Sequence, residues 1–395
     1  MSSSKIRLTV VETHPVQYHA PVYRCLQQDF GHDVTVIYGS DSSINGGLDI
    51  EFGVSVKWDT DLVSGYQPVF LTSIKDQAWR PSIARGYSRL AKAIQASDPD
   101  AVLLVGYAHR LYLNAFAACS GRYPLLYRAE ASDVAKIRNW AKSNARDILL
   151  RGLYSRMAGI LYIGKNALTH FKRLGVPNCR LYRSPYCVDT TSFQPASREA
   201  QCRTAVRAEL GIPENTIVLM FSGKLSERKG PEHIIQAVRS MPDHEREQIT
   251  CLFVGDGKLS DRLYSYAAEW PTVKIRLVGF KNQSTISQYY YAADCLVLPS
   301  LFSETWGLVV NDALWHGRPA VVSSAVGCAL DLIVPGITGE VFEAGSVEGL
   351  RHAITRARAW ISNPEHHESC RAAVADYSVF DAASGLDRAL VSILN

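Results

Sequence analysis

Short apolar runs alternate with amphipathic stretches along almost all of the 395 residues. In the first part of the chain, strands are expected over residues 6–11, 33–38, 101–106, 125–128 and 159–163, and helices over 22–28, 83–96, 111–119, 143–158 and 167–174. In the second part, strands are expected over 216–222, 248–254, 273–278, 295–299 and 319–323, and helices over 231–240, 259–268, 284–292 and 307–317, with further helices after 347. This rhythm predicts an α/β fold in which helices cover parallel sheets.

The rhythm breaks over residues 188–201, a polar stretch that contains Pro195. We therefore expect two doubly wound, Rossmann-like domains, 1–195 and 196–375, and a C-terminal helix, 376–395, that packs back on the N-terminal domain. A chain of this length commonly holds two domains. Ligands of such sheets bind at the carboxyl ends of the strands, so the central cleft between the two domains is the expected site.

The composition excludes several classes of protein. The 42 basic and 38 acidic residues give a net charge of +4, which is too weak by itself to indicate nucleic-acid binding. The nine cysteines form no C-x-x-C pair and several lie in apolar runs, which is typical of reduced, buried thiols in a cytoplasmic protein. Neither a signal peptide nor an apolar run long enough to span a bilayer is evident.

Two carboxylates, Glu304 and Asp312, stand eight positions apart after an apolar strand and around a glycine. On one helix they would be roughly 12 Å apart along the axis, at about 1.5 Å per residue. That separation exceeds the range of about 9.5 Å for the paired carboxyl groups of glycoside hydrolases. The spacing favours instead a grip on two ends of a long anionic ligand.

The phosphates of such a ligand would lie at the helix N-terminus, where unpaired amides and the helix dipole favour negative charge. The residues that would present these amides are Thr305, Trp306, Gly307 and Leu308. The alternative is an ordinary helix start, with Ser303 as N-cap, Glu304 in the first turn and Asp312 on the surface.

A glycine- and lysine-rich loop follows the strand at 216–222. Gly223 and Lys224 come directly after the strand, and Lys229 precedes a second glycine and a helix. Glycines let a backbone approach a ligand closely, and two ammonium groups can neutralise a diphosphate. The alternative is a solvated loop with surface lysines. The order of residues excludes a P-loop.

Two further strand ends carry turn residues. Gly255 lies in Val-Gly-Asp-Gly at 254–257, and Phe280 follows Val-Gly at 278–279. Backbone groups there could hold a nucleobase edge, with Phe280 as an aromatic wall, although Gly-Asp-Gly taken alone favours simple turn chemistry.

Polar and aromatic residues follow three strands of the first domain, at the expected edge of the cleft. The first strand leads into His14, Gln17 and Tyr18, the strand at 101–106 leads to His109, and the strand at 125–128 leads to Arg128 and Glu130. A solvated loop remains the alternative, above all for the lone histidine His109.

The segment 136–156 is basic and has apolar residues interleaved, from Lys136 and Arg138 to Ile148, Leu149 and Arg156. A basic amphipathic helix is a candidate for peripheral contact with a membrane surface. The alternative is a core-packed helix with a solvated cationic face.

Together these motifs resemble the GT-B glycosyltransferases and, within them, the large retaining family four, the glycosyl transferases group 1. The likeness rests on residues 223–230, 254–257, 278–280, 292–300, 303–313 and 336–339, and on 182–193, which resembles the family's segment at the end of the first domain. His14-Pro-Val-Gln-Tyr18 resembles a subgroup with an N-terminal His-Pro-x-Gln-Tyr.

The resemblance implies a donor site in the C-terminal domain. Lys224 and Lys229 would grip the diphosphate of a nucleotide-sugar donor, and Glu304 would contact the transferred sugar. Asp312 would contact the ribose, at a position where the family usually has the longer Glu. Phe280 matches a position whose backbone faces the base.

The resemblance also implies an acceptor site in the N-terminal domain, with His109 as the best match to the family's catalytic histidine there. The implied reaction is transfer of a sugar, with retention, to a hydroxyl of a glycan, a lipid-linked molecule or a small molecule. No cofactor or metal is expected, because the cations would stabilise the leaving group. Asp59-Thr60-Asp61 fits a metal-binding pattern but lies far along the chain from every donor motif.

Two other functions remain open at this stage. One is another GT-B enzyme, such as a sugar-nucleotide epimerase or a phosphorylase. The other is a non-catalytic subunit that binds nucleotides or glycans, which the departure at Asp312 alone would encourage. A dehydrogenase is disfavoured, because no G-x-G-x-x-G follows the first strand.

Overall fold

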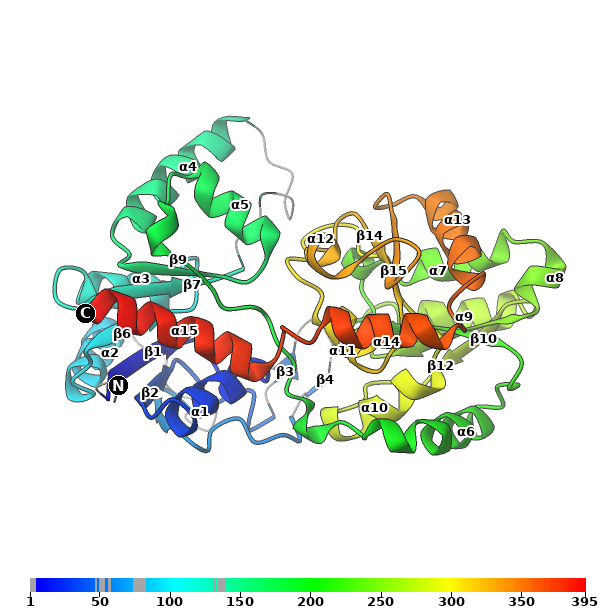
Figure 1. Cartoon of the computed structure of the whole chain (residues 1–395), viewed down its shortest axis with the longest axis horizontal. Helices are drawn as coiled ribbons and strands as arrows, with labels where there is room; N and C mark the ends of the chain where they lie inside the picture. The colour runs from blue at the N-terminus through cyan, green and yellow to red at the C-terminus, as the bar shows by residue number, and fades with distance from the viewer. Residues whose placement is uncertain are drawn as a thin grey trace.

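The computed structural model describes residues 5–46, 48–49, 54–55, 58–73, 83–130, 133 and 140–395. These residues form two separate parallel sheets, each covered by helices, that lie next to one another in an elongated molecule (Figure 1). The predicted α/β class is confirmed.

The first sheet belongs to the N-terminal half. Its strand order is β5-β2-β1-β6-β7-β8-β9. The strands are β1 (Arg7–Glu12), β2 (Asp33–Tyr38), β5 (Gln67–Phe70), β6 (Ala101–Leu104), β7 (Leu125–Arg128), β8 (Gly159–Tyr162) and β9 (Leu181–Arg183). The helices are α1 (Ala20–Gln28), α2 (Ile83–Ala96), α3 (Arg110–Cys119), α4 (Trp140–Ser155) and α5 (Lys165–Arg173). A two-stranded hairpin, β3 (Leu48–Asp49) and β4 (Val54–Ser55), lies outside the sheet.

The second sheet belongs to the C-terminal half. Its strand order is β12-β11-β10-β13-β14-β15. The strands are β10 (Ile217–Ser222), β11 (Ile249–Val254), β12 (Lys274–Leu277), β13 (Cys295–Leu298), β14 (Ala320–Ser323) and β15 (Gly339–Phe342). The helices are α6 (Glu199–Glu209), α7 (Glu232–Arg239), α8 (Asp243–Arg246), α9 (Ser260–Glu269), α10 (Gln283–Ala292), α11 (Leu308–Trp315), α12 (Ala329–Leu332), α13 (Val347–Arg358) and α14 (Pro364–Ala373).

The central strands of both sheets are buried on both faces. β7 and β13 have no exposed position, as expected for a parallel sheet between two helical layers. The first strand of each half lies inside its sheet. β1 lies between β2 and β6, and β10 lies between β11 and β13. The carboxyl ends of these strands therefore lie close together, and the loops that follow them can build one site.

The chain crosses between the halves twice. Residues 184–198 lead from β9 to α6, and residues 374–378 lead from α14 back to α15 (Val379–Leu394). Helix α15 contacts α1, β8 and β9, and its Leu386 and Leu390 are buried in the same cluster as Leu8 (Figure 1). We propose domain boundaries near residues 195 and 375 on this basis.

All nine cysteines are free thiols, and seven of them are buried. Burial raises the pKa of Cys251 and of Cys370 to about 12, so these thiols are packing residues rather than nucleophiles. Among the described residues, no helix has the length and apolar composition that a membrane span requires.

Candidate active site

The segment that carries Glu304 precedes helix α11 instead of opening it. The helix begins at Leu308, and its N-cap is Gly307, which has a left-handed backbone with φ of 97°. The alternative in which Ser303 caps the helix and Glu304 lies in its first turn is wrong. Glu304 pairs instead as an isolated β-bridge with Val326. The estimate of roughly 12 Å along one helix axis therefore does not apply.

The carboxylate of Glu304 is surrounded by hydrogen-bond donors and cations. Glu304 is only 8% exposed. Its Oε2 forms an ion pair with the ammonium of Lys229, lies 3.5 Å from Nη1 of Arg228 and accepts a hydrogen bond of 2.9 Å from the hydroxyl of Ser300. Sequence reasoning assigned no role to Arg228 or Ser300, because their link to Glu304 needs the fold.

The glycine loops of the second sheet lie against each other at the ends of β10, β11 and β12. The amide of Gly223 donates to Val254 O at 3.0 Å, and the amide of Gly255 donates to Gly279 O at 2.9 Å. A Cβ atom on Gly255, whose φ is +146°, would lie 1.9 Å from Gly223 O, so only glycine fits there. Lys224 directly follows Gly223, so its backbone is held at the edge of the second sheet where β10 ends.

Asp312 lies within α11 and is buried, with 6% exposure, so the alternative that it is a surface residue is wrong. Its Oδ2 accepts a hydrogen bond of 3.3 Å from the hydroxyl of Tyr290, and its Oδ1 has no partner among the described residues. Burial raises the pKa of Asp312 to about 7. A buried acceptor without a partner is available to a ligand that brings a donor.

Phe280, which follows β12 of the second sheet, contacts a residue of the N-terminal half. The rings of Phe280 and Trp58 meet edge to face, with centroids 6.0 Å apart. Next to Trp58, the carboxylate of Asp59 accepts hydrogen bonds from the amide of Ser284, at 3.2 Å, and from its hydroxyl. Ser284 lies in the first turn of α10. The Asp59-Thr60-Asp61 segment is therefore distant from the donor motifs in sequence but adjacent to one in space, and sequence analysis missed this.

Two predicted cleft residues of the N-terminal half, Arg128 and Glu130, meet around Tyr186. Arg128 is buried, lies over the Tyr186 ring at 5.3 Å and donates to Pro185 O at 3.1 Å. Glu130 accepts a hydrogen bond of 2.6 Å from the hydroxyl of Tyr186. It also accepts one from the hydroxyl of Thr305, which comes from the C-terminal half.

Gln17 and Tyr18 also lie at the boundary between the halves. Gln17 Oε1 accepts a hydrogen bond of 3.2 Å from Nε2 of Gln283. The Tyr18 ring meets Tyr186 edge to face with centroids 5.1 Å apart, and Tyr186 in turn meets Trp306 at 6.1 Å. Predicted residues from both halves thus share one boundary.

His14 and His109 lie elsewhere. They are exposed and line a cavity of about 530 Å³ together with hydroxyl residues such as Thr13 and with Arg89, at the ends of the strands of the first sheet. His109 also caps α3, because its Nδ1 accepts a hydrogen bond of 3.2 Å from Leu111 N. The structure therefore groups the two histidines with each other, apart from Glu304 and Lys229.

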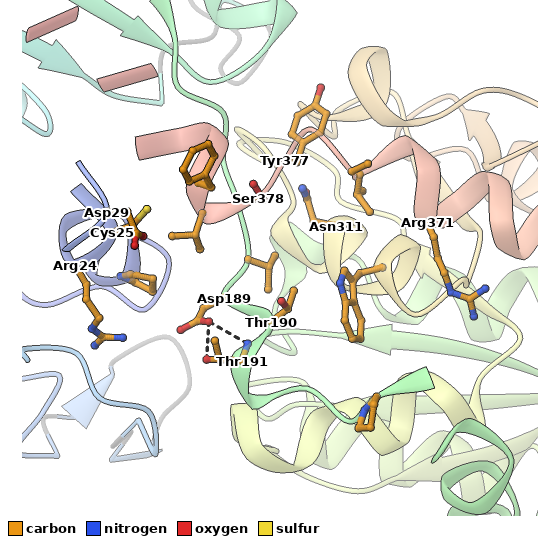
Figure 2. A pocket seen from close by; sticks show the side chains of 18 of the residues that line it. Arg24, Cys25, Asp29, Asp189, Thr190, Thr191, Asn311, Arg371, Tyr377 and Ser378 are labelled. Carbon is orange, nitrogen blue, oxygen red and sulfur yellow. Dashed lines mark hydrogen bonds between the residues drawn. The ribbon is translucent and has the colours of Figure 1, made fainter. Parts of the chain in front are cut away.

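A second cavity, of about 740 Å³, lies beside the two crossing segments. Figure 2 shows Arg24 of α1 and Asn311 of α11 on opposite sides of it. The Asn311 side chain accepts a hydrogen bond of 2.9 Å from the indole of Trp306, which links this cavity to the segment that carries Glu304.

Helix α5 contacts the C-terminal half directly. The amide of Lys165, at the start of α5, donates to both carboxylate oxygens of Asp331 at 3.1 and 3.2 Å. The side chain of Asn166 donates to Gly327 O at 2.9 Å. These contacts hold the halves together next to the Glu304 segment.

The family model of "Glycosyl transferases group 1" matches residues 203–376. Among curated proteins, granule-bound starch synthase 1 of Triticum aestivum is 32% identical over 178 residues, which is 42% of this chain and 28% of that protein. D-inositol 3-phosphate glycosyltransferase of Corynebacterium glutamicum is 32% identical over 164 residues, 40% of this chain and 38% of that protein. The chain thus matches well under half of each of these relatives.

Solved structures match along nearly the whole chain. Anabaena Alr3699/HepE in complex with UDP-glucose superposes with a TM-score of 0.72 at 18% identity, covering 98% of this chain and all of that one (100%). A glycosyltransferase from Rickettsia africae superposes with a TM-score of 0.73 at 16% identity, covering 100% of both chains. At such identities the likeness shows the fold alone. The chain thus has the GT-B fold of these structures, and its residues 203–376 match the family model of glycosyl transferases group 1.

Proposed function

We propose that this protein transfers a sugar from a nucleoside diphosphate sugar to an acceptor hydroxyl, with retention at the anomeric carbon and without a metal ion. The observation that carries the proposal is the Glu304 carboxylate, held by Lys229 and Arg228 directly before α11 in a group 1 domain. The similarity to Anabaena Alr3699/HepE, which was solved with UDP-glucose, supports a nucleotide-sugar donor.

The donor would lie on the C-terminal half. Lys224, Lys229 and the free amides at the start of α11 would stabilise the negative charge that develops on the leaving diphosphate. Glu304 would contact the transferred sugar. The leaving phosphate would take the proton of the acceptor hydroxyl on the same face, so the mechanism needs no nucleophile from the protein.

The acceptor would lie on the N-terminal half. This chain would belong to the subgroup of the family that carries an N-terminal His-Pro-x-Gln-Tyr. Gln17, Tyr18, Arg128 and Glu130 are the acceptor-side residues at the boundary, and His14 and His109 line the cavity of about 530 Å³ that an acceptor would enter. A glycan, a lipid-linked sugar and a small molecule all offer the required hydroxyl. Closure of the halves would exclude water and suppress donor hydrolysis.

We also propose a cytoplasmic protein with peripheral membrane contact through α4. Ile148 and Leu149 are 70% and 65% exposed on this helix, and Arg151 is exposed beside them. Lys136 and Arg138, which belong to the same predicted surface, lie outside the described residues. Co-sedimentation with anionic liposomes should fall in an Ile148→Ser/Leu149→Ser variant, and unchanged co-sedimentation would refute the contact.

The test of the activity is product analysis with labelled nucleotide sugars and a panel of acceptors. Transfer with retained anomeric configuration supports the proposal, whereas an epimerised nucleotide sugar or a sugar phosphate would favour the other GT-B enzymes. Lys229→Ala should reduce transfer by at least about 100-fold, the scale seen when one group that stabilises developing charge is removed. Lys172→Ala, on the exposed side of α5, is the matched control.

A further inference from the structure

The cavity of about 740 Å³ beside the two crossing segments, here named the crossing cavity, takes no part in the proposed mechanism. Its wall includes Arg24 and Cys25 of α1, Asn311 of α11, and residues of both crossing segments, such as Asp189 and Ser378 (Figure 2). Its volume is within the range of about 300–1,000 Å³ that is typical of small-molecule pockets. A molecule in this cavity would therefore contact both halves of the chain and both connections between them.

The lining of the crossing cavity is largely apolar, and its charges balance. Two arginines and two aspartates line it, and they are Arg24, Arg371, Asp29 and Asp189. Four aromatic side chains also line it, and they are Tyr291, Trp315, Tyr377 and Phe380. Aromatic rings bind other rings by stacking and by edge-to-face contact. A balanced charge next to several rings favours an uncharged ligand with a flat aromatic body.

Asn311 supplies a buried donor to this cavity. It is only 3% exposed, and its Oδ1 accepts a hydrogen bond of 2.9 Å from the indole of Trp306. Because an indole N–H can only donate, this bond fixes which end of the amide is oxygen. The other end, Nδ2, is buried and has no partner among the described residues. In Figure 2 this nitrogen points toward Ser378, which lines the same cavity. A buried donor without an acceptor is unfavourable, so the cavity is complementary to a ligand that brings a carbonyl oxygen.

The wall of the crossing cavity is connected to the candidate active site. Trp306, which is bonded to Asn311, lies two residues after Glu304 in the same segment. The ring of Tyr377, from the second crossing segment, lies 5.9 Å from the Trp306 ring. The Tyr377 hydroxyl also donates to Asp331 Oδ1 at 3.4 Å, and Asp331 is the residue that joins the two halves at the start of α5. A ligand that contacts Asn311 and Tyr377 would thus bear on both the Glu304 segment and the contact between the halves.

We propose that the crossing cavity binds an uncharged aromatic molecule whose carbonyl oxygen accepts a hydrogen bond from Asn311, and that this ligand is an effector of donor binding. The site itself goes beyond the proposed function, whereas the effect on the donor rests on it. A ligand that contacts α1 and α11 together stabilises the arrangement of the halves in which both helices line the cavity. In that arrangement the Glu304 segment is held in place, so the donor nucleotide should bind more tightly.

The first experiment compares two probes that differ in one group, using ligand-observed NMR on the whole chain. The probes are 2-acetylnaphthalene, a ketone, and 2-isopropenylnaphthalene, in which a methylene group replaces the carbonyl oxygen. The wild type should bind the ketone about fivefold more tightly, because a net hydrogen bond is worth about 1 kcal/mol. Failure of the ketone to bind would overturn the site, and equal affinities for the two probes would overturn the role of Asn311.

Variants locate the probe in the crossing cavity. Ala375 is exposed and lines it, so Ala375→Phe places a ring there and should weaken both probes by about tenfold or more. Ala372→Phe is the matched control, because Ala372 is exposed on α14 and is not among the described lining residues. Asn311→Leu should weaken the ketone alone, and its cost to Trp306 is common to both probes, so the ratio of affinities reports the amide. Unchanged binding in Ala375→Phe would show that the probe lies elsewhere and would overturn the site.

The second experiment tests the effector role by calorimetry. UDP, ADP and GDP are titrated into the wild type, and the tightest of them is titrated again with the ketone at saturation. The ketone should raise the affinity for the nucleotide about fivefold, and the nucleotide should raise the affinity for the ketone by the same factor. An unchanged nucleotide affinity would overturn the effector role. If none of the three diphosphates bound, the proposed function would fail and the effector role with it, whereas binding of the ketone would still support the site.

Discussion

The ammonium group of Lys229 forms an ion pair with the carboxylate of Glu304, in a site where both are expected to contact the donor. Arg228 lies 3.5 Å from the same carboxylate oxygen. Glu304 therefore neutralises, in the absence of donor, cations that a diphosphate would use. When the donor binds, its phosphates and Glu304 compete for Lys229, and the carboxylate becomes available to the transferred sugar.

Substitution of Glu304 by Gln should separate binding from turnover. Glu304→Gln frees Lys229 and Arg228, so a nucleoside diphosphate should bind about 3–10-fold more tightly, because charge-assisted contacts with phosphate are no longer in competition. Transfer should fall by at least about 100-fold if Glu304 serves the sugar. Calorimetry and steady-state kinetics measure the two quantities, and weaker diphosphate binding would contradict the competition.

Asp312 should make the stability of the C-terminal half depend on pH. Its pKa is raised by burial from 3.8 to about 7, so the unfolded state releases this proton at lower pH than the native state. Between these two pH values the native state holds the Asp312 proton more often than the unfolded state does. The free energy of unfolding therefore decreases as the pH rises toward 7. Asp312→Asn removes this loss and can still accept from Tyr290.

The difference in unfolding free energy between Asp312→Asn and wild type should therefore increase from pH 5 to pH 8. About two pH units separate pH 5 from the raised pKa, which corresponds to a change of about 3 kcal/mol in favour of the variant. Urea unfolding at both pH values measures it. Parallel behaviour of the two proteins would show that Asp312 is ionised throughout.

The contact between Asp331 and the start of α5 should favour the closed arrangement. Lys165 N donates to both carboxylate oxygens, and a carboxylate at a helix N-terminus is worth about 0.3–1 kcal/mol. Asp331→Asn should reduce transfer about 2–5-fold and increase the radius of gyration in small-angle scattering. Asp243→Asn, at an exposed position of α8, serves as control. An unchanged radius of gyration in Asp331→Asn would refute the role of this contact in closure.

Arg207 should be among the most costly residues to replace in the C-terminal half. It has no exposed surface, and its Nη2 contacts Asp294 Oδ2 at 2.7 Å while its other nitrogens donate to backbone carbonyls. Arg207→Met removes the buried positive charge that pairs with the Asp294 carboxylate. It should lower the unfolding free energy by about 3 kcal/mol. Urea unfolding would show this, with the exposed Arg388→Met as control, and equal stability would contradict it.

The same arginine shows why part of the fold could not be predicted from the sequence. Strands such as β2 and β7 are rich in large apolar residues, and their predicted bounds match the structure. Helix α6 was missed, because its buried face carries the charged Arg207, which hides the apolar periodicity that indicates a helix. Strand β9 has three residues and a half-buried pattern, which is too short to show a period.

The candidate site divides in a similar way. The residue types at strand ends, such as Lys229 and Glu304, can be recognised from their motifs. Their mutual ion pair cannot, because it depends on how the loop after β10 lies against the loop after β13. The start of α11 at Leu308 agrees with the predicted helix over 307–317 to within one residue, whereas the alternative with Ser303 as N-cap is wrong, because the left-handed Gly307 is the N-cap. The contact of Asp59 with Ser284 joins residues far apart in the chain, and no local pattern signals it.

The return of α15 to the first sheet has a consequence for the order of events during synthesis. The face of α1 that packs on α15, and the cluster that holds Leu8 and Leu390, cannot be completed until the ribosome has passed through the whole C-terminal half. The elements of the C-terminal half, from α6 to α14, are contiguous in the chain, so that half can fold as one unit without waiting for α15. The half that is translated first therefore finishes second, and a nascent chain interrupted before Val379 should leave that apolar face open to chaperones.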